Sequence, residues 1–181
     1  MRLNLSMFRL LFLFVMLISI GAFARSTEGV LQLKEIEQQK DNTVAVKQLT
    51  QFLEQAGVTS EERINAFLLK SRRHLSLNDF EQAMFASQQA HQISKQTGHA
   101  NLQAQADKLQ GVICYFQGEY ERALSFYKAS LAYYQRLNLS YDVDKFAKNA
   151  IAQANLLNNI ALVQTAIGDA IGALNSYQQA E

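Results

Sequence analysis

The sequence predicts an all-α protein, a right-handed solenoid of antiparallel helical hairpins, from three observations. The 181 residues include no proline and only 8 glycines, too few turn residues for an all-β fold. Apolar residues make up 49% and charged residues 18%, a balance that supplies a core and disfavours disorder. One short pattern also recurs three times, which predicts that the core is assembled from repeated units.

Each copy of the pattern is a turn residue, an acid, a third residue that is aromatic in two copies, and a small residue three positions later. The copies begin at Asn78-Asp79-Phe80, Gly118-Glu119-Tyr120 and Gly168-Asp169-Ala170. Gly or Asn accepts the left-handed backbone that ends one helix, and the acid starts the next helix at the positive end of its dipole. Small residues seven positions apart then let the two helices approach closely. The residues that define the repeat are Ala83, Gly111, Gly118, Tyr120, Ala123, Ala161, Gly168 and Ala173.

A helix, a tight turn and a second helix, repeated in this way, resembles the tetratricopeptide repeat. The likeness covers about residues 60–181 and is clearest at Asn155-Leu156-Leu157-Asn158-Asn159-Ile160-Ala161 followed by Ala166-Ile167-Gly168-Asp169. The expected units are 59–97, 99–137 and 141–181. Successive turns are 40 and 50 residues apart instead of about 34, and no proline closes a unit. These departures resemble the long-helix bacterial variety found in sensor and regulator proteins, with the extra residues expected between 138 and 149.

The first 24 residues have the pattern of a signal peptide. Arg2 and Arg9 precede an apolar run of 14 residues from Leu10 to Phe23, short for a membrane span of about 20 residues. The small-x-small sequence Ala22-Phe23-Ala24 predicts cleavage before Arg25 and export to the bacterial periplasm. An uncleaved anchor in the inner membrane, facing the periplasm, is the alternative.

Residues 25–58 are expected to form a degenerate hairpin, broken at Asp41-Asn42, that caps the array. Thr59-Ser60-Glu61-Glu62 then predicts a capping box at the start of the next helix. At the other end, residue 181 falls inside the second helix of the third unit, without a polar terminal cap, which favours a fragment of a longer protein. The resemblance implies that a membrane helix and a cytoplasmic diguanylate cyclase or histidine kinase domain follow.

The sequence favours no enzyme activity, metal or cofactor. It contains no phosphate-binding glycine loop, HExxH motif, paired-cysteine metal site or nucleophile elbow. Its histidines, His74, His91 and His99, are scattered, and His91 and His99 are expected to be solvated near a helix end. The single cysteine, Cys114, has apolar neighbours and is expected to be a small buried side chain. Without the two arginines of the signal, 15 of the 17 basic residues remain against 16 acidic ones, too few to predict nucleic-acid binding.

Binding of a protein or peptide is the expected function, because the first helices of stacked hairpins line a concave groove. Asn and Gln side chains bond a peptide backbone in either direction, and Arg72 and Lys108 suit a carboxylate. Tyr134 and Tyr141 are expected outside the core as anchors for a partner. The expected groove residues are Asn65, Leu68, Arg72, Gln105, Lys108, Tyr115, Asn155 and Asn158.

Two interpretations compete with a binding groove. The polar residues of the first helices can equally be an ordinary solvated surface. The chain can also be a structural, self-assembling array in which the third hairpin pairs with another copy. Contact with a membrane is expected only through the N-terminal segment or through a part of the protein beyond residue 181.

Replacing Ala123 or Ala173 by leucine tests the predicted hairpin register. Each change is expected to lower the free energy of unfolding by about 1–3 kcal/mol, because a larger side chain overpacks the helix crossing. Urea denaturation measures this. Unchanged melting of both variants would contradict the register.

Overall fold

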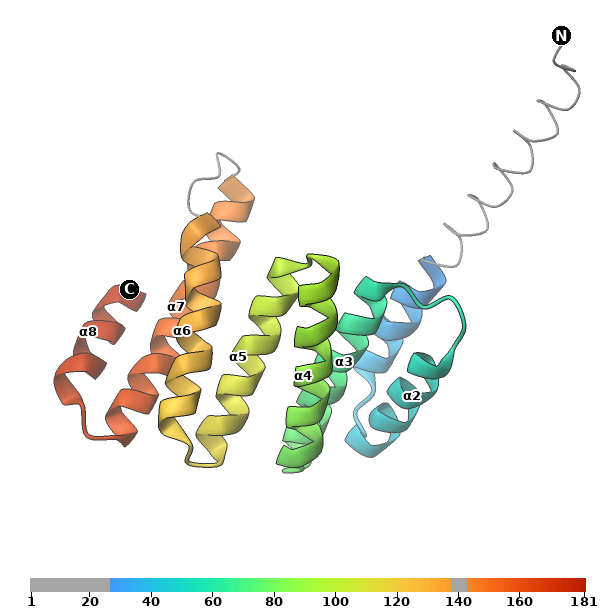
Figure 1. The fold of residues 1–181 in the computed structure, drawn as a ribbon, viewed down its shortest axis with the longest axis horizontal. Helices are drawn as coiled ribbons and strands as arrows, with labels where there is room; N and C mark the ends of the chain where they lie inside the picture. Colours follow the sequence, from blue (N-terminus) through green and yellow to red (C-terminus); the bar gives the residue numbers. More distant parts are fainter. Residues whose placement is uncertain (1–26, 138–142) are drawn as a thin grey trace, which may run out of the picture.

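The computed structural model describes residues 27–137 and 143–181, and all regular elements within these ranges are helices. The chain begins with a helix over residues 27–38, and the remaining helices follow in order. They are α2 (Asn42–Glu54), α3 (Ser60–Ser76), α4 (Phe80–Thr97), α5 (Ala100–Phe116), α6 (Tyr120–Arg136), α7 (Val143–Ala166) and α8 (Ala170–Ala180). Successive helices lie side by side in one elongated row (Figure 1). The predicted all-α solenoid of helical hairpins is therefore confirmed, whereas residues 1–24 lie outside the described part.

The three predicted turns have the expected left-handed backbone. The φ angles are 57° at Asn78, 75° at Gly118 and 83° at Gly168. Each following acid is the N-cap residue itself, one position before its helix. Asp79 and Asp169 accept a backbone N–H through their side chains, but Glu119 makes no such bond. The turn prediction is confirmed, with the acids acting as N-caps instead of first-turn residues.

Small residues bring the two helices of each hairpin together. In the α3–α4 hairpin, the Ser71 hydroxyl donates to the Ala83 carbonyl at 2.8 Å, and both residues are fully buried. In the α5–α6 hairpin, a Cβ atom at Gly111 would lie 2.6 Å from Cε1 of Tyr127. A serine hydroxyl bonds the facing helix at the first crossing, and the Tyr127 ring fills the space beside the glycine at the second. The predicted close approach is thus achieved in two different ways.

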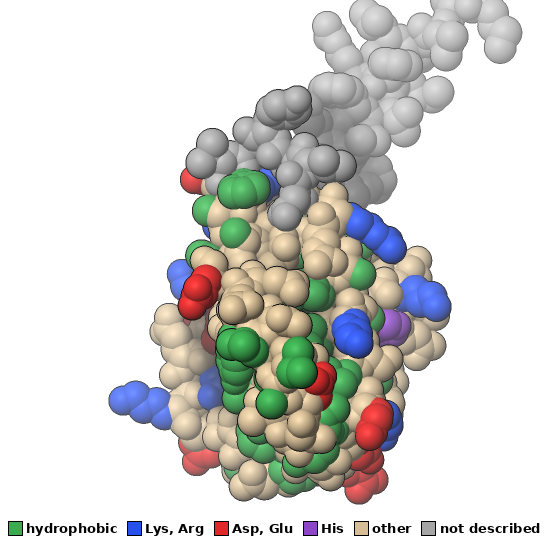
Figure 2. Space-filling view, turned by 90° about the vertical axis from the view of Figure 1, so that its left-hand side faces the viewer, with side chains coloured by type: hydrophobic (Ala, Val, Ile, Leu, Met, Phe, Trp, Pro, Cys, Tyr) green, Lys and Arg blue, Asp and Glu red, His purple; other side chains and the backbone are tan. Residues whose placement is uncertain are grey.

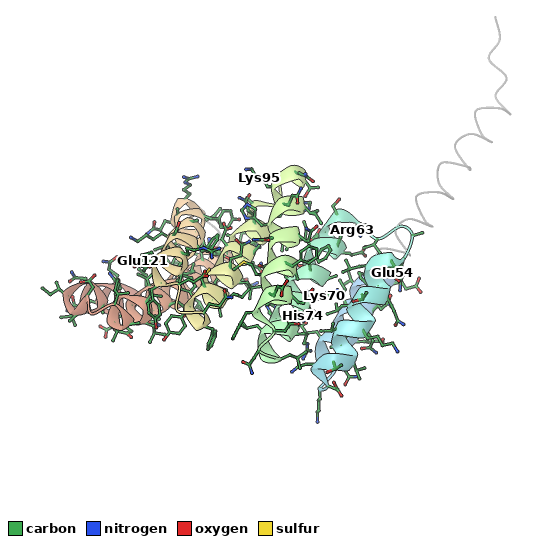
Figure 3. The ribbon with its side chains drawn as sticks, turned by 60° about the horizontal axis from the view of Figure 1, so that its bottom comes forward. Glu54, Arg63, Lys70, His74, Lys95 and Glu121 are labelled. Atoms are coloured by element: carbon green, nitrogen blue, oxygen red, sulfur yellow. The ribbon has the colours of Figure 1, made fainter. Side chains whose placement is uncertain are left out.

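The N-terminal pair of helices is held to α3 by polar contacts. The Lys70 ammonium donates to Thr50 Oγ1 at 2.9 Å, and the Arg63 guanidinium donates to the Leu53 carbonyl at 3.1 Å. Figure 3 shows Arg63 and Lys70 on the side of α3 that meets α2. The predicted capping box is confirmed, because Thr59 and Glu62 exchange both of its hydrogen bonds.

Helix α7 is longer than the other inner helices. It has 24 residues, against 17 in both α3 and α5, and residues 143–149 form its first turns. Part of the extra length between the turns at Gly118 and Gly168 is therefore helical. Helix α7 projects together with α6 beyond the other hairpins (Figure 1). Of the two tyrosines expected outside the core, Tyr134 is buried and donates to Asn101 Oδ1 at 3.3 Å, so that expectation is wrong. Tyr141 lies outside the described residues.

A double-mutant cycle on Gly111 and Tyr127 tests the second crossing. Alanine favours a helix by up to about 1 kcal/mol over glycine. The new methyl group would nevertheless meet a ring that is only 3% exposed, so we expect G111A to be destabilising by about 1 kcal/mol overall.

In the Y127S background, where the ring is absent, G111A should instead be stabilising. Urea denaturation of the four proteins measures both effects. An equal loss of stability in the two backgrounds would show that the ring contact does not control this crossing.

Candidate binding groove

A cavity of about 350 Å³ opens between the helix 27–38, α3 and α5. Residues of α3 spaced three or four positions apart share the face that lines it, as expected for one side of a helix. Leu33, Leu68 and Leu69 contribute apolar surface to its wall. The charged and amide side chains that line it are Lys34, Glu37, Glu61, Glu62, Asn65, Arg72 and Gln105. An apolar surface with polar side chains at its border is the usual make-up of a site for an organic or peptide ligand.

The structure brings together half of the residues expected in the groove. Asn65, Leu68, Arg72 and Gln105 all line the cavity. Leu68 is only 2% exposed, so it forms part of the apolar wall and not an exposed contact as expected. The reason is that the side chain also packs against Ile64 and Leu109 in the core.

The other expected groove residues lie elsewhere. Tyr115 packs at the tip of the α5–α6 hairpin, with its ring 5.8 Å from Phe116 and 5.9 Å from Tyr120. Asn155 and Asn158 are exposed on α7 and do not line this cavity. The groove is therefore confined to the N-terminal half of the solenoid and does not follow all the inner helices.

Arg72, at one end of the groove, has a second cation near it, Lys108, which does not itself line the cavity. Lys108 lies close enough to Arg72 for the two charges to repel each other. Burial lowers the pKa of the Lys108 ammonium, and the Arg72 charge lowers it further. Within the described residues, neither side chain forms an ion pair with a carboxylate. Two neighbouring cations without a counter-ion create a local positive potential that an anionic group would relieve.

Carboxylates occupy the other end of the groove, at the start of α3. Glu62 is 5% exposed, and its Oε2 accepts hydrogen bonds from the backbone N–H and the hydroxyl of Thr59 at 2.8 and 2.9 Å. Its Oε1 is buried without a hydrogen-bond partner, close to Gly29. Glu61, in the same first turn, is exposed. This end of the groove is therefore negative.

Arg73 holds the wall of the groove that the helix 27–38 forms. Its Nη1 donates to Asn42 Oδ1 at 3.0 Å, and its Nη2 donates to the backbone carbonyls of Ile36 and Glu37. These carbonyls belong to the last turns of the helix, where a cation also meets the negative end of the dipole. The sequence offers no signal for this contact, because the partners are 31 to 37 residues away.

His99 lies at a helix end as expected, as the N-cap residue of α5, but His91 differs from the solvated position expected for it. His91 lies within α4, and its Nδ1 is 2.7 Å from Oδ1 of Asp107 on α5. Asp107 is buried, and burial raises the pKa of its carboxyl group while His91 opposes the shift. His74 Nδ1 lies 3.1 Å from Oδ2 of Asp79. Both pairs join consecutive helices, so these histidines have a structural role that the sequence did not indicate.

The described residues contain no group of three or more His, Cys, Asp or Glu side chains placed to hold a metal ion. None of their helices is long and apolar enough to cross a membrane. Cys114 is buried, as expected, in the core cluster around Tyr127.

These features define the class of the protein as an all-α hairpin solenoid with a groove of mixed charge. No protein-family model matches the chain, and no curated protein matches its sequence. Its fold is similar to that of BtubC (BKLC) from P. vanneervenii, with a TM-score of 0.53 and 16% sequence identity. The match covers 90% of this chain and 80% of BtubC. At that identity, the similarity concerns the fold alone.

The reactivity of Cys114 with a disulfide reagent tests its burial. Burial is the main cause that raises the pKa of this thiol, to about 11. Since the thiolate is the reacting species, we expect the native protein to react at pH 8 at least about 100-fold more slowly than the urea-unfolded protein. Absorbance of the released thiolate measures both rates, with C114A as the blank. Equal rates in the two states would contradict the burial.

Proposed function

We propose that this chain is a non-catalytic, tetratricopeptide-type module that binds an extended segment of a protein or peptide in the groove between the helix 27–38, α3 and α5. The observation that carries the proposal is Arg72, which lines the cavity beside amide side chains and an apolar wall, with Lys108 near it and no ion pair for either cation in the described residues. The side chains of Asn65 and Gln105 can both donate to and accept from a peptide backbone. Leu33 and Leu68 offer apolar surface to a side chain of the bound segment.

The cellular setting is part of the same proposal. Arg2, Arg9, the apolar run that follows and Ala22-Phe23-Ala24 support export to the periplasm. The resemblance to long-repeat bacterial sensors supports a sensory or scaffolding role in a longer signalling protein of the diguanylate cyclase or histidine kinase type. Osmotic-shock fractionation, with the mass of the released form, tests the first point. A chain that stays in the cytoplasm with residues 1–24 attached would contradict export.

Hydrogen exchange in the presence of peptides tests the groove directly. Pools of blocked, unstructured decapeptides of varied composition are added to the protein at millimolar concentration. At least one pool should slow amide exchange in the helix 27–38, α3 and α5, because ordering of the groove reduces local opening. Exchange in α6 and α8 is the internal control. The proposal fails if every pool leaves α3 and α5 unchanged.

A second candidate function, self-association, is favoured by the exposed face of α8. Ile171 is 77% exposed, Leu174 58% and Tyr177 40%, and α8 contains no charged residue. Figure 2, which views the end of the solenoid formed by α8, shows hydrophobic side chains gathered there. The α6 equivalents of Leu174 and Tyr177 are Leu124 and Tyr127, which pack in or against the core cluster together with residues of α7, whereas the equivalent of Ile171 is the exposed Glu121. A face of this kind is a typical protein contact surface.

Sedimentation at several protein concentrations separates the two candidates. If α8 mediates self-association, the protein should dimerise as its concentration rises, and I171K should abolish the dimer because it places a charge in the contact. Lys substitution of the exposed Gln178 of the same helix is the matched control. A strict monomer at millimolar concentration would exclude self-association.

A further inference from the structure

We infer that the groove selects a segment carrying an acidic side chain, held by Arg72 with the charge of Lys108 nearby, and a basic side chain about five residues away, held near Glu61 and Glu62. This inference rests on the proposed function and specifies the chemistry of the partner. The segment binds in an extended conformation, so its two charged side chains reach opposite ends of the groove.

The positive end of the groove, which Arg72 lines, suits an acidic side chain of the partner. Arg72 lines the cavity and lies in the electrostatic range of Lys108, and neither has a carboxylate partner among residues 27–137 and 143–181. A guanidinium offers a carboxylate two parallel N–H donors, and the ammonium adds a point charge. The carboxylate would also offset the repulsion between these two like charges, which is present in the free protein.

The negative end of the groove, at the start of α3, suits a basic side chain of the partner. Glu61 is exposed, and Glu62 retains a carboxylate oxygen that no donor satisfies. Neither carboxylate forms an ion pair within the described residues. A lysine or arginine side chain of the bound segment would place its charge next to Glu61, where it also lowers the cost of the buried Glu62 charge.

The opposite wall adds little net charge. Lys34 and Glu37 both line the cavity from the helix 27–38 and stand three positions apart, so they are neighbours of opposite sign on one face of the helix. Their charges largely cancel along the groove. The polarity is therefore set by the α3 and α5 side, with carboxylates at the start of α3 and cations near its end.

The helix also sets the distance between the two charges of the partner. Glu61 and Arg72 are separated by 11 positions of one helix, which at 1.5 Å per residue is about 16 Å. An extended chain advances about 3.3 Å per residue, so about five residues span the same distance. A shorter interval would leave one of the two charges without its counterpart.

Binding of two blocked decapeptides tests the inference. Both have an acetylated N-terminus, an amidated C-terminus and the same composition, with one Lys and one Glu either five positions or one position apart. The peptide with the five-residue interval should bind about five-fold more tightly in isothermal titration at low salt, and the preference should fade in 0.5 M NaCl because salt screens exposed charges.

A cycle between protein and peptide assigns each charge. R72A should weaken binding of the decapeptide with the five-residue interval about five-fold. It should leave binding of the Glu-to-Gln analogue of that peptide unchanged. E61Q should likewise weaken binding of the peptide with the five-residue interval and leave binding of its Lys-to-Gln analogue unchanged. K95A, at the far end of α4, and E121Q, in the first turn of α6, remove the same charges away from the groove (Figure 3) and should have no effect.

The outcomes separate this inference from the proposed function. Equal binding of the two peptides and of their Gln analogues would overturn the charge selection while leaving a peptide groove in place. Tighter binding of the same peptide with a free C-terminus than with an amide would show that Arg72 and Lys108 hold a terminal carboxylate instead of an acidic side chain, which overturns it as well. Failure of every peptide pool in hydrogen exchange would overturn the proposed function itself.

Discussion

The close approach of the two helices within each hairpin is the constraint on which the rest of the structure depends. Ser71 and Gly111 stand where a larger side chain would force the helices apart. Serine resolves the crossing with a hydrogen bond to the Ala83 carbonyl, and glycine resolves it by admitting the Tyr127 ring. Because the two helices of these hairpins lie close together at their crossing, α3 and α5 can pack against each other on one side of the row. The groove lies on that side.

The groove combines a firm support with charges that lack counterparts. Arg73 and Lys70 bind the N-terminal helices to α3 through backbone carbonyls and a hydroxyl group, so their charges are used within the fold. Arg72, next in sequence to Arg73, has no such partner and lines the cavity. Adjacent arginines on one helix therefore have opposite roles, because 100° of helical rotation turns one toward the end of the helix 27–38 and the other toward the groove.

The repeat pattern made much of the fold predictable from sequence, because turns and crossings are local. Gly118 and Gly168 mark left-handed turns, and Thr59 and Glu62 mark a capping box, within segments of a few residues. Half of the groove residues could also be predicted, since Asn65 and Arg72 share a face of one helix. The prediction that Tyr115 lies in the groove was wrong, because periodicity on α5 does not reveal that its ring packs against aromatic neighbours at the hairpin tip.

The sequence by itself determined the helices, their turns and the small residues at their crossings, because these depend on contacts between near neighbours in the chain. Only the tertiary structure decided which charges remain unpaired. The bonds of Arg73 to Asn42 and Ile36, the His91–Asp107 pair and the meeting of Arg72 with Lys108 join residues 16 to 37 positions apart. Such contacts depend on how successive hairpins stack, and the stacking angle follows from the packing of whole helix faces, not from any one motif.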